Sequence, residues 1–317
     1  MPMTIASLAL ALLTTTSGSS GSRGATDTTF NVPADGRLEV DTFSGEIEVR
    51  TWNRNAVRVE AEHGSRSWIV VDTKGSNVSI RARDRRGLPT NVDYHLTVPA
   101  TMSLELSGVS TEIAVTGSRG EVKASTVNGD VVVDGGVRFV SLSSVEGEVK
   151  LTGAKGRIEV SSVNQGVSVE HSVGEIVAET VNGDVELDVD SEVVEASTVN
   201  GSIRYDGPYK DGGSYTFSTH NGDILLTIPE KSNATVSVAT FSGDFSSSFP
   251  LQLSETRRGK RFSFTLGTGK ARVELESFQG SIQLRRPGEA AVHTGKKHGH
   301  DPDIEINVDP DEDDEDQ

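Results

Sequence analysis

Acidic residues recur after glycine at several positions along the middle of the chain. Carboxylate oxygens are ligands that calcium prefers, so a column of such acids could hold a row of calcium ions. The column consists of Asp130, Glu148, Asp184, Asp223 and Asp244. Gly166 and Ser202 interrupt it, and the glycine-rich calcium-binding repeat of other solenoids is absent. Tight-turn chemistry alone explains aspartate after Asn-Gly, and we expect no metal site here.

A second pattern resembles a phosphate-binding loop. Residues 267–270 read Gly-Thr-Gly-Lys, and a lysine after a glycine-rich turn could contact a phosphate. The motif requires Ser or Thr after the lysine and Gly at its first position. This chain has Ala271 and Phe264 there, so the match fails.

The seven histidines form no H-E-x-x-H motif. His171 and His220 stand beside expected turns, and we expect them to be packed or solvated rather than catalytic. The third group, near the C-terminus, could bind a divalent metal loosely, although a solvated tail is the simpler interpretation. It consists of His293, His298 and His300. The sequence therefore assigns no catalytic, cofactor-binding or metal residue, and we expect no cofactor.

Composition excludes several further classes of protein. The 317 residues include no cysteine, which excludes disulfides, iron-sulfur clusters, thiolate zinc sites, cysteine nucleophiles and a lipoprotein anchor. The formal net charge of -17 argues against a nucleic-acid partner, because duplex affinity comes largely from Lys and Arg. Two basic runs, at residues 81–86 and 257–261, have acidic or polar flanks. We expect them to be solvated loops or edge-strand charges.

The chain contains an internal repeat of 18 residues built around Val-Asn-Gly-Asp-Val. Five copies follow one another at this spacing, at residues 127–131, 145–149, 163–167, 181–185 and 199–203. Looser copies occur at residues 43–47, 220–224, 241–245 and 278–282, the last three after steps of 21, 21 and 37. A fixed period of this length is typical of a solenoid, in which each repeat buries its apolar face against its neighbours.

The repeats align into apolar and polar columns. The apolar columns begin at Val122, Val131 and Val133, and polar columns alternate with them, as expected of strands with one buried face. Up to Thr126 the inward positions have even numbers, whereas from Val127 they have odd numbers. This change predicts a corner at the Thr126–Val127 junction. We also predict one buried ladder, made of Val127, Val145, Val163, Val181 and Val199. A second corner is expected near Gly135–Gly136 and their counterparts Gly153 and Gly207, so each repeat has two strands of about six residues.

Asn-Gly between strands is also a strong hairpin signal, so an antiparallel meander is the alternative to a parallel solenoid. The conserved residue type within each column favours the solenoid, because stacked coils place like residues over one another. The asparagine column is Asn128, Asn164, Asn182 and Asn200, and the hydroxyl column is Thr126, Ser144, Ser162, Thr180 and Thr198. We therefore predict an all-β, parallel β-solenoid with 18-residue, two-strand coils.

The two ends of the chain have a different composition. Residues 5–13 form an apolar core followed by small polar residues, which predicts a signal peptide over residues 1–25 and export; a disordered N-terminus is the alternative. Acids dominate the C-terminus, and a disordered acidic tail is expected over residues 287–317. Between them we expect a strand-rich N-terminal part at residues 28–115 and the solenoid repeats at residues 116–286. No stretch after the signal is long enough for a transmembrane helix.

The sequence resembles the DUF4097 family of bacterial envelope proteins. The resemblance rests on F-x-V-x-x-x-G-x-L-x-V at residues 30–40, the Ser-Gly-Glu-Ile-Glu-Val of residues 44–49, and the repeated Ser-Thr-Val-Asn-Gly-Asp-Val. It covers about residues 28–286. The resemblance implies a β-strand-repeat solenoid related to candidate adhesins, with no established activity and no catalytic signature.

Three functions remain open from the sequence. The first is a non-catalytic exported scaffold that binds an envelope protein or a surface glycan along the rod. The second is a polysaccharide lyase or glycosidase, since β-helices host such enzymes and paired carboxylates could do acid-base work. Only two tryptophans, Trp52 and Trp68, could serve as sugar platforms, and both precede the regular repeats. The third is a regulatory envelope-stress partner of a membrane protein. We favour the first and expect no enzymatic activity.

Overall fold

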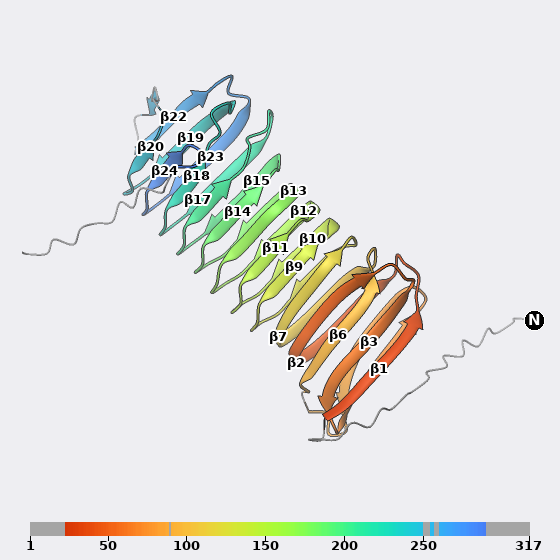
Figure 1. The fold of residues 1–317 in the computed structure, drawn as a ribbon. Helices are drawn as coiled ribbons and strands as arrows, with labels where there is room; N and C mark the ends of the chain where they lie inside the picture. Colours follow the sequence, from red (N-terminus) through yellow and green to blue (C-terminus); the bar gives the residue numbers. More distant parts are fainter. Residues whose placement is uncertain (1–22, 89, 250–253, 257–259, 290–317) are drawn as a thin grey trace, which may run out of the picture.

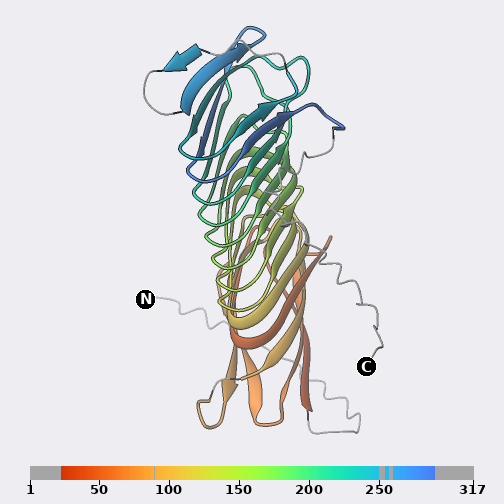
Figure 2. The same cartoon turned by 90° about the vertical axis from the view of Figure 1, so that its left-hand side faces the viewer.

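The structure is a computed structural model, and it describes residues 23–88, 90–249, 254–256 and 260–289. These residues form a rod of stacked coils (Figure 1). The turns of successive coils lie above one another along the rod (Figure 2). The described part is all-β, without a helix, and is the predicted parallel β-solenoid.

Each coil contributes a strand to each of two faces. In order along the rod, the first face consists of β4 (Ser67–Lys74), β5 (Asn77–Asp84), the first half of β2 (Arg37–Trp52), the first half of β7 (Ser103–Ser118), β8 (Val122–Ser125), β10 (Val137–Ser143), β12 (Lys155–Ser161), the second half of β13 (Val167–Glu179), β15 (Val193–Thr198), β17 (Ser214–Thr219), β23 (Ala271–Ser277), β19 (Ala234–Thr240), β22 (Lys260–Leu266) and β21 (Ser254–Thr256).

The second face consists of the other strand of each coil. In order, it consists of β1 (Arg23–Asn31), β3 (Ala56–Gly64), β6 (Val92–Pro99), the second half of β2, the second half of β7, β9 (Val131–Gly135), β11 (Val149–Thr152), the first half of β13, β14 (Val185–Val189), β16 (Ile203–Asp206), β18 (Ile224–Thr227), β24 (Ile282–Arg285) and β20 (Phe245–Ser247).

The core lies between the two faces and follows the predicted apolar columns. Val149 pairs in parallel with Val131 on one side and with Val167 on the other, each 18 residues away. All three side chains are at most 1% exposed. Parallel pairing at a fixed offset excludes the meander, whose neighbouring strands would run in opposite directions.

The ladder that begins at Val127 is continuous, but the prediction that it is buried was wrong. Its five valines are between 37% and 48% exposed. Thr126 is the last inward residue before the corner, and the next inward residue is Val131. The four residues between them travel around the outside of the rod, so the parity changes across the whole corner rather than at the Thr126–Val127 junction.

Hydroxyl groups occupy the last inward position before the corner because the corner backbone needs a donor there. Ser162 Oγ donates to the carbonyl of Gly147 at 2.9 Å, and Thr198 Oγ1 donates to that of Gly183 at 2.9 Å. The same bond recurs in neighbouring coils. A valine at this site would leave a buried carbonyl without this partner, which explains why the hydroxyl column persists.

The second corner varies from coil to coil. Gly135 and Gly153 have φ of 96° and 72°, the left-handed conformation that glycine adopts readily, and they lie where the prediction placed them. In the next coil β13 runs through the corner as a single strand, and His171 there has φ of 50°. The prediction of two separate strands per repeat therefore fails for that coil.

The chain order changes near the C-terminal end of the rod. β17 pairs with β23, and β23 in turn pairs with β19, so the last coil in the sequence inserts between two earlier ones. This insertion explains the step of 37 residues in the repeat. Antiparallel strands β22 and β21 then close the first face.

The N-terminal end has a matching arrangement. The coil of β5 and β6 lies outside that of β2, although it follows β2 in the sequence, and antiparallel strands β4, β3 and β1 cover it. Residues 23–25, assigned above to the signal peptide, belong to β1. The rest of the expected signal peptide, and residues 290–317 of the expected tail, lie outside the described residues.

Candidate functional site

Three of the post-glycine carboxylates bind the backbone of the neighbouring coil. Asp130 Oδ1 accepts a hydrogen bond from the Glu148 amide at 2.8 Å, and Asp184 Oδ1 accepts one from the Ser202 amide at 2.7 Å. Asp223 contacts the Ser281 amide in the same way, at 2.7 Å. Each aspartate thus fastens one corner to the next. Within the described ranges, no group of three or more His, Asp or Glu residues could hold a metal ion.

The Gly-Thr-Gly-Lys segment is a turn between β22 and β23. Gly267 and Gly269 have φ of 56° and 70°. Lys270 Nζ forms an ion pair with Asp211 Oδ2 at 2.6 Å, and this hydrogen bond lowers the pKa of the Asp211 carboxyl. The lysine is therefore engaged within the fold. Of the histidines, His171 lies at the second corner and His220 at the first, whereas His293, His298 and His300 lie outside the described residues.

The first corner carries an exposed apolar ladder along nearly the whole rod, which we call the corner ladder. Backbone hydrogen bonds of 2.7–3.1 Å join its successive rungs from Val109 onward, and the pairing of Ser44 with Ser110 adds Phe43 at the N-terminal end. At a coil spacing of about 4.8 Å, the ladder is about 43 Å long. Its members are Phe43, Val109, Val127, Val145, Val163, Val181, Val199, His220, Phe278 and Phe241.

Aromatic rings form the C-terminal end of the corner ladder. The ring of Phe278 stacks between those of His220 and Phe241, with centroid distances of 4.7 and 4.8 Å and interplanar angles of 5° and 2°. Phe241 is 72% exposed. Because the rings stack on one another, Phe278 offers its edge rather than its faces to a ligand.

A row of amides runs beside the valines. Asn182 Nδ2 donates to Asn164 Oδ1 at 3.0 Å, Asn200 donates to Asn182 at 2.8 Å, and Asn221 donates to Asn200 at 2.8 Å. The amides are thus bound to one another. This row gives the apolar ladder a polar border, an arrangement that marks interaction surfaces on other proteins.

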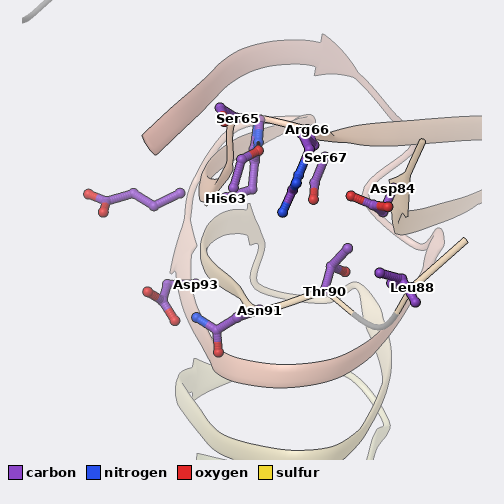
Figure 3. A pocket seen from close by; sticks show the side chains of 11 residues that line it. His63, Ser65, Arg66, Ser67, Asp84, Leu88, Thr90, Asn91 and Asp93 are labelled. Atoms are coloured by element: carbon purple, nitrogen blue, oxygen red, sulfur yellow. Dashed lines mark hydrogen bonds between the residues drawn. The ribbon is translucent and has the colours of Figure 1, made fainter. Parts of the chain in front are cut away.

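At its N-terminal end the corner ladder reaches a hollow of about 650 Å³. The hollow lies where the β3–β4 turn and the segment after β5 cross the corner, and Figure 3 shows the residues that line it. His63 is 9% exposed. Its Nε2 lies 3.0 Å from Thr26 Oγ1 and its Nδ1 lies 3.0 Å from the Gly64 carbonyl. Both ring nitrogens are therefore used within the fold.

This hollow was not predicted from the sequence, because its lining comes from segments that only the tertiary fold brings together. The outward direction of the corner ladder was also missed. The alternation of inward and outward positions could have shown it. Thr126 already occupies the last inward position before the corner, so the residue after it points outward.

Of the two tryptophans, Trp52 donates to the Ala56 carbonyl at 2.7 Å, and Trp68 is 43% exposed.

The Toastrack DUF4097 family matches residues 14–285. The chain belongs to this family. The described part of this Toastrack chain contains no helix long and apolar enough to cross a membrane. No curated protein matches the sequence.

Several solved structures are similar to this Toastrack chain. A candidate adhesin from Bacteroides fragilis is 10% identical, with a TM-score of 0.39, and the match covers 82% of this chain and 97% of that one. A candidate lipid-binding protein from Parabacteroides distasonis is 10% identical, with a TM-score of 0.41 and coverage of 83% and 97%. A candidate cell adhesion protein from Clostridium sporogenes is 10% identical, with a TM-score of 0.23 and coverage of 83% and 100%. At these TM-scores the likenesses carry no argument about function.

Proposed function

We propose that this Toastrack protein is an exported, non-catalytic scaffold that binds a partner in the cell envelope along its corner ladder. The observation that carries the proposal is the unbroken row of exposed valines, which is too long to be an accident of isolated surface residues. Covering a row of water-exposed apolar side chains with a partner is favourable, because it removes apolar surface from water.

The chemistry of the ladder favours a protein partner over a surface glycan. Valine side chains supply no hydrogen bonds, and the neighbouring amides of Asn164, Asn182 and Asn200 already bind one another. Sugar rings prefer open aromatic faces; the valines of the ladder offer none, and the stacked Phe278 ring offers only its edge. An apolar segment of an envelope protein would instead cover the valines without leaving unpaired polar groups.

Export supports a partner of this kind. The apolar residues 5–13 favour a secreted or envelope location. Cleavage before Arg23 would leave β1 intact, whereas cleavage after Ala25 would remove three residues that pair with β3. Cell fractionation with N-terminal sequencing tests this expectation, and a protein that stays in the cytoplasm with Met1 attached contradicts it.

The binding test compares two kinds of exposed valine. The double variant Val163→Asn/Val181→Asn makes the middle of the corner ladder polar, while Val132→Asn alters a valine that is 46% exposed on the second face, away from the corner. In pull-downs from native envelope, the double variant should lose the partners that the unaltered chain retains, and Val132→Asn should keep them. Equal recovery with all three proteins contradicts binding along the ladder.

A further inference from the structure

The N-terminal end of the rod has the opposite charge to the rest of the protein. Residues 64–88 contain six bases and two acids, a net charge of +4 in a chain whose net charge is -17. The basic run at residues 81–86 belongs to this segment. In the fold, residues 64–88 form β4 and β5, the outermost two strands of the first face, and the beginning of the loop that crosses the corner.

Pairing of β4 with β5 gathers apolar and basic side chains at this end. Trp68 lies directly opposite Arg83, so their side chains are neighbours on the outer face of the sheet. The Arg85 amide lies 3.4 Å from the Arg66 carbonyl, which brings the two corner-crossing segments together. Trp68, on β4, is 43% exposed, and Leu88, in the loop after β5, is 58% exposed.

Some arginines at this end have an acidic partner, and four others have none among the described residues. Arg58 pairs with Asp27 at 2.9 Å, and Arg81 pairs with Glu39 at 2.8 Å. No such ion pair to a carboxylate of the described residues exists for the exposed guanidinium groups of Arg66, Arg83, Arg85 and Arg86. The neighbouring Asp84 carboxylate accepts a hydrogen bond from the Arg86 amide at 2.7 Å.

Unpaired arginines beside an exposed tryptophan and leucine have the composition of a surface that binds anionic membranes. Arginines near such a membrane each contribute about a fivefold gain in binding, and tryptophan prefers the headgroup region. The hollow behind the arginines is unsuited to a small free anion, because Glu62, Asp84 and Asp93 line it together with Arg66. The favourable partner is therefore a broad anionic surface that contacts the arginines around the rim of the hollow.

We propose that the N-terminal end of the rod docks on an anionic lipid membrane. Arg83, Arg85 and Arg86 contact lipid phosphates, while Trp68 and Leu88 enter the headgroup region. The proposal does not depend on the ladder binding a partner, because it rests on different residues.

The test measures binding of the full chain to vesicles of phosphatidylcholine with roughly 30% phosphatidylglycerol. Binding is compared with that to pure phosphatidylcholine, so that the contribution of the apolar residues 5–13 cancels. Arg85→Gln/Arg86→Gln should lower the anionic-vesicle partition coefficient about thirtyfold. The matched control, Lys123→Gln/Arg204→Gln, removes the same charge from exposed positions in the middle of the rod and should leave binding within about twofold.

The apolar residues distinguish a membrane from a soluble polyanion. Trp68→Ser and Leu88→Ser should each weaken vesicle binding severalfold, and Trp68 fluorescence should shift to shorter wavelength in a Trp52→Phe background. Binding to soluble polyphosphate depends on charge alone, so these two variants should not change it. Vesicle binding that is insensitive to all these variants overturns the proposal. Loss with the arginine variant alone, matched by equal affinity for polyphosphate, overturns it in favour of a polyanion site.

Discussion

The Ser162 hydroxyl donates a hydrogen bond of 2.9 Å to the carbonyl of Gly147, which lies fifteen residues earlier and in the preceding coil. This contact joins the last inward residue of one coil to the corner of its neighbour. It determines which residues turn outward, because the hydroxyl takes the last inward place before the corner. The valine that follows must then lie outside, and repetition of this arrangement produces the corner ladder.

Removal of this hydroxyl should destabilise the rod. Thr198→Val keeps the shape of the side chain but leaves the Gly183 carbonyl without its 2.9 Å partner, and we expect a loss of about 1–3 kcal/mol in the free energy of unfolding. Thr216→Val alters an outward-facing threonine on the first face and should change stability by less than about 0.5 kcal/mol. Denaturant unfolding measures both, and equal effects would contradict the role of the hydroxyl column.

The inside–outside assignment of the strands predicts a large contrast between two adjacent residues. Val185 is completely buried and Glu186 is exposed. Val185→Asp should cost several kcal/mol or force protonation of the new carboxyl, because its neighbours Val167 and Ile203 supply no cation. Glu186→Gln should stay within about 0.5 kcal/mol. Similar melting temperatures for the two variants would reject the assignment.

Close stacking of the corners predicts that one glycine is replaceable and another is not. A Cβ atom on Gly201 would lie 1.9 Å from the carbonyl oxygen of Gly183, so the backbone of two coils must move apart to accept it. A Cβ atom on Gly166 would meet its nearest neighbour, the Asp184 carbonyl, at 3.2 Å. Thermal unfolding should therefore show a much larger loss for Gly201→Ala than for Gly166→Ala. The reverse order would mean that the corners stack less closely than described.

The ion pair between Asp27 and Arg58 predicts a small loss of stability in acid. The hydrogen bond from Arg58 lowers the pKa of Asp27 below 3.8, against an opposing effect of burial. The contribution of this ion pair to stability is thus complete above the pKa of Asp27 in the unfolded chain. It is lost as the pH falls through the pKa of Asp27 in the folded protein. Both side chains are well exposed, so we expect at most about 0.5 kcal/mol. The difference in unfolding free energy between the unaltered chain and Asp27→Asn should shrink below about pH 4; a constant difference contradicts this expectation.

The sequence predicted the regular part of the fold because stacking repeats the same environment every 18 residues. Val131, Val149 and Val167 share a column for this reason, and all three are buried. The same periodicity could not show the direction of the Val127 column, because an apolar column arises on either side of a corner. The hydroxyl column carried that information, because its residues mark the last inward position before the corner.

The ends of the rod escaped prediction for a different reason. The insertion of β23 between β17 and β19 depends on which coil a distant strand joins, and local residue patterns do not encode that choice. The basic N-terminal end likewise depends on the pairing of β4 with β5 and of β5 with β2. In the fold, Lys270 of the phosphate-loop-like segment pairs with Asp211, and Asp130 and Asp184 accept hydrogen bonds at the corners.

Site-specific photo-crosslinking in the native envelope tests the central claim most directly. A photoreactive residue replaces Val163 in the corner ladder or Val132 on the second face, two valines of similar type that are 37% and 46% exposed. Our account predicts that the Val163 position forms a discrete crosslinked adduct and that the more exposed Val132 position does not. Adducts of equal yield at both positions, or at Val132 alone, would contradict binding along the corner ladder.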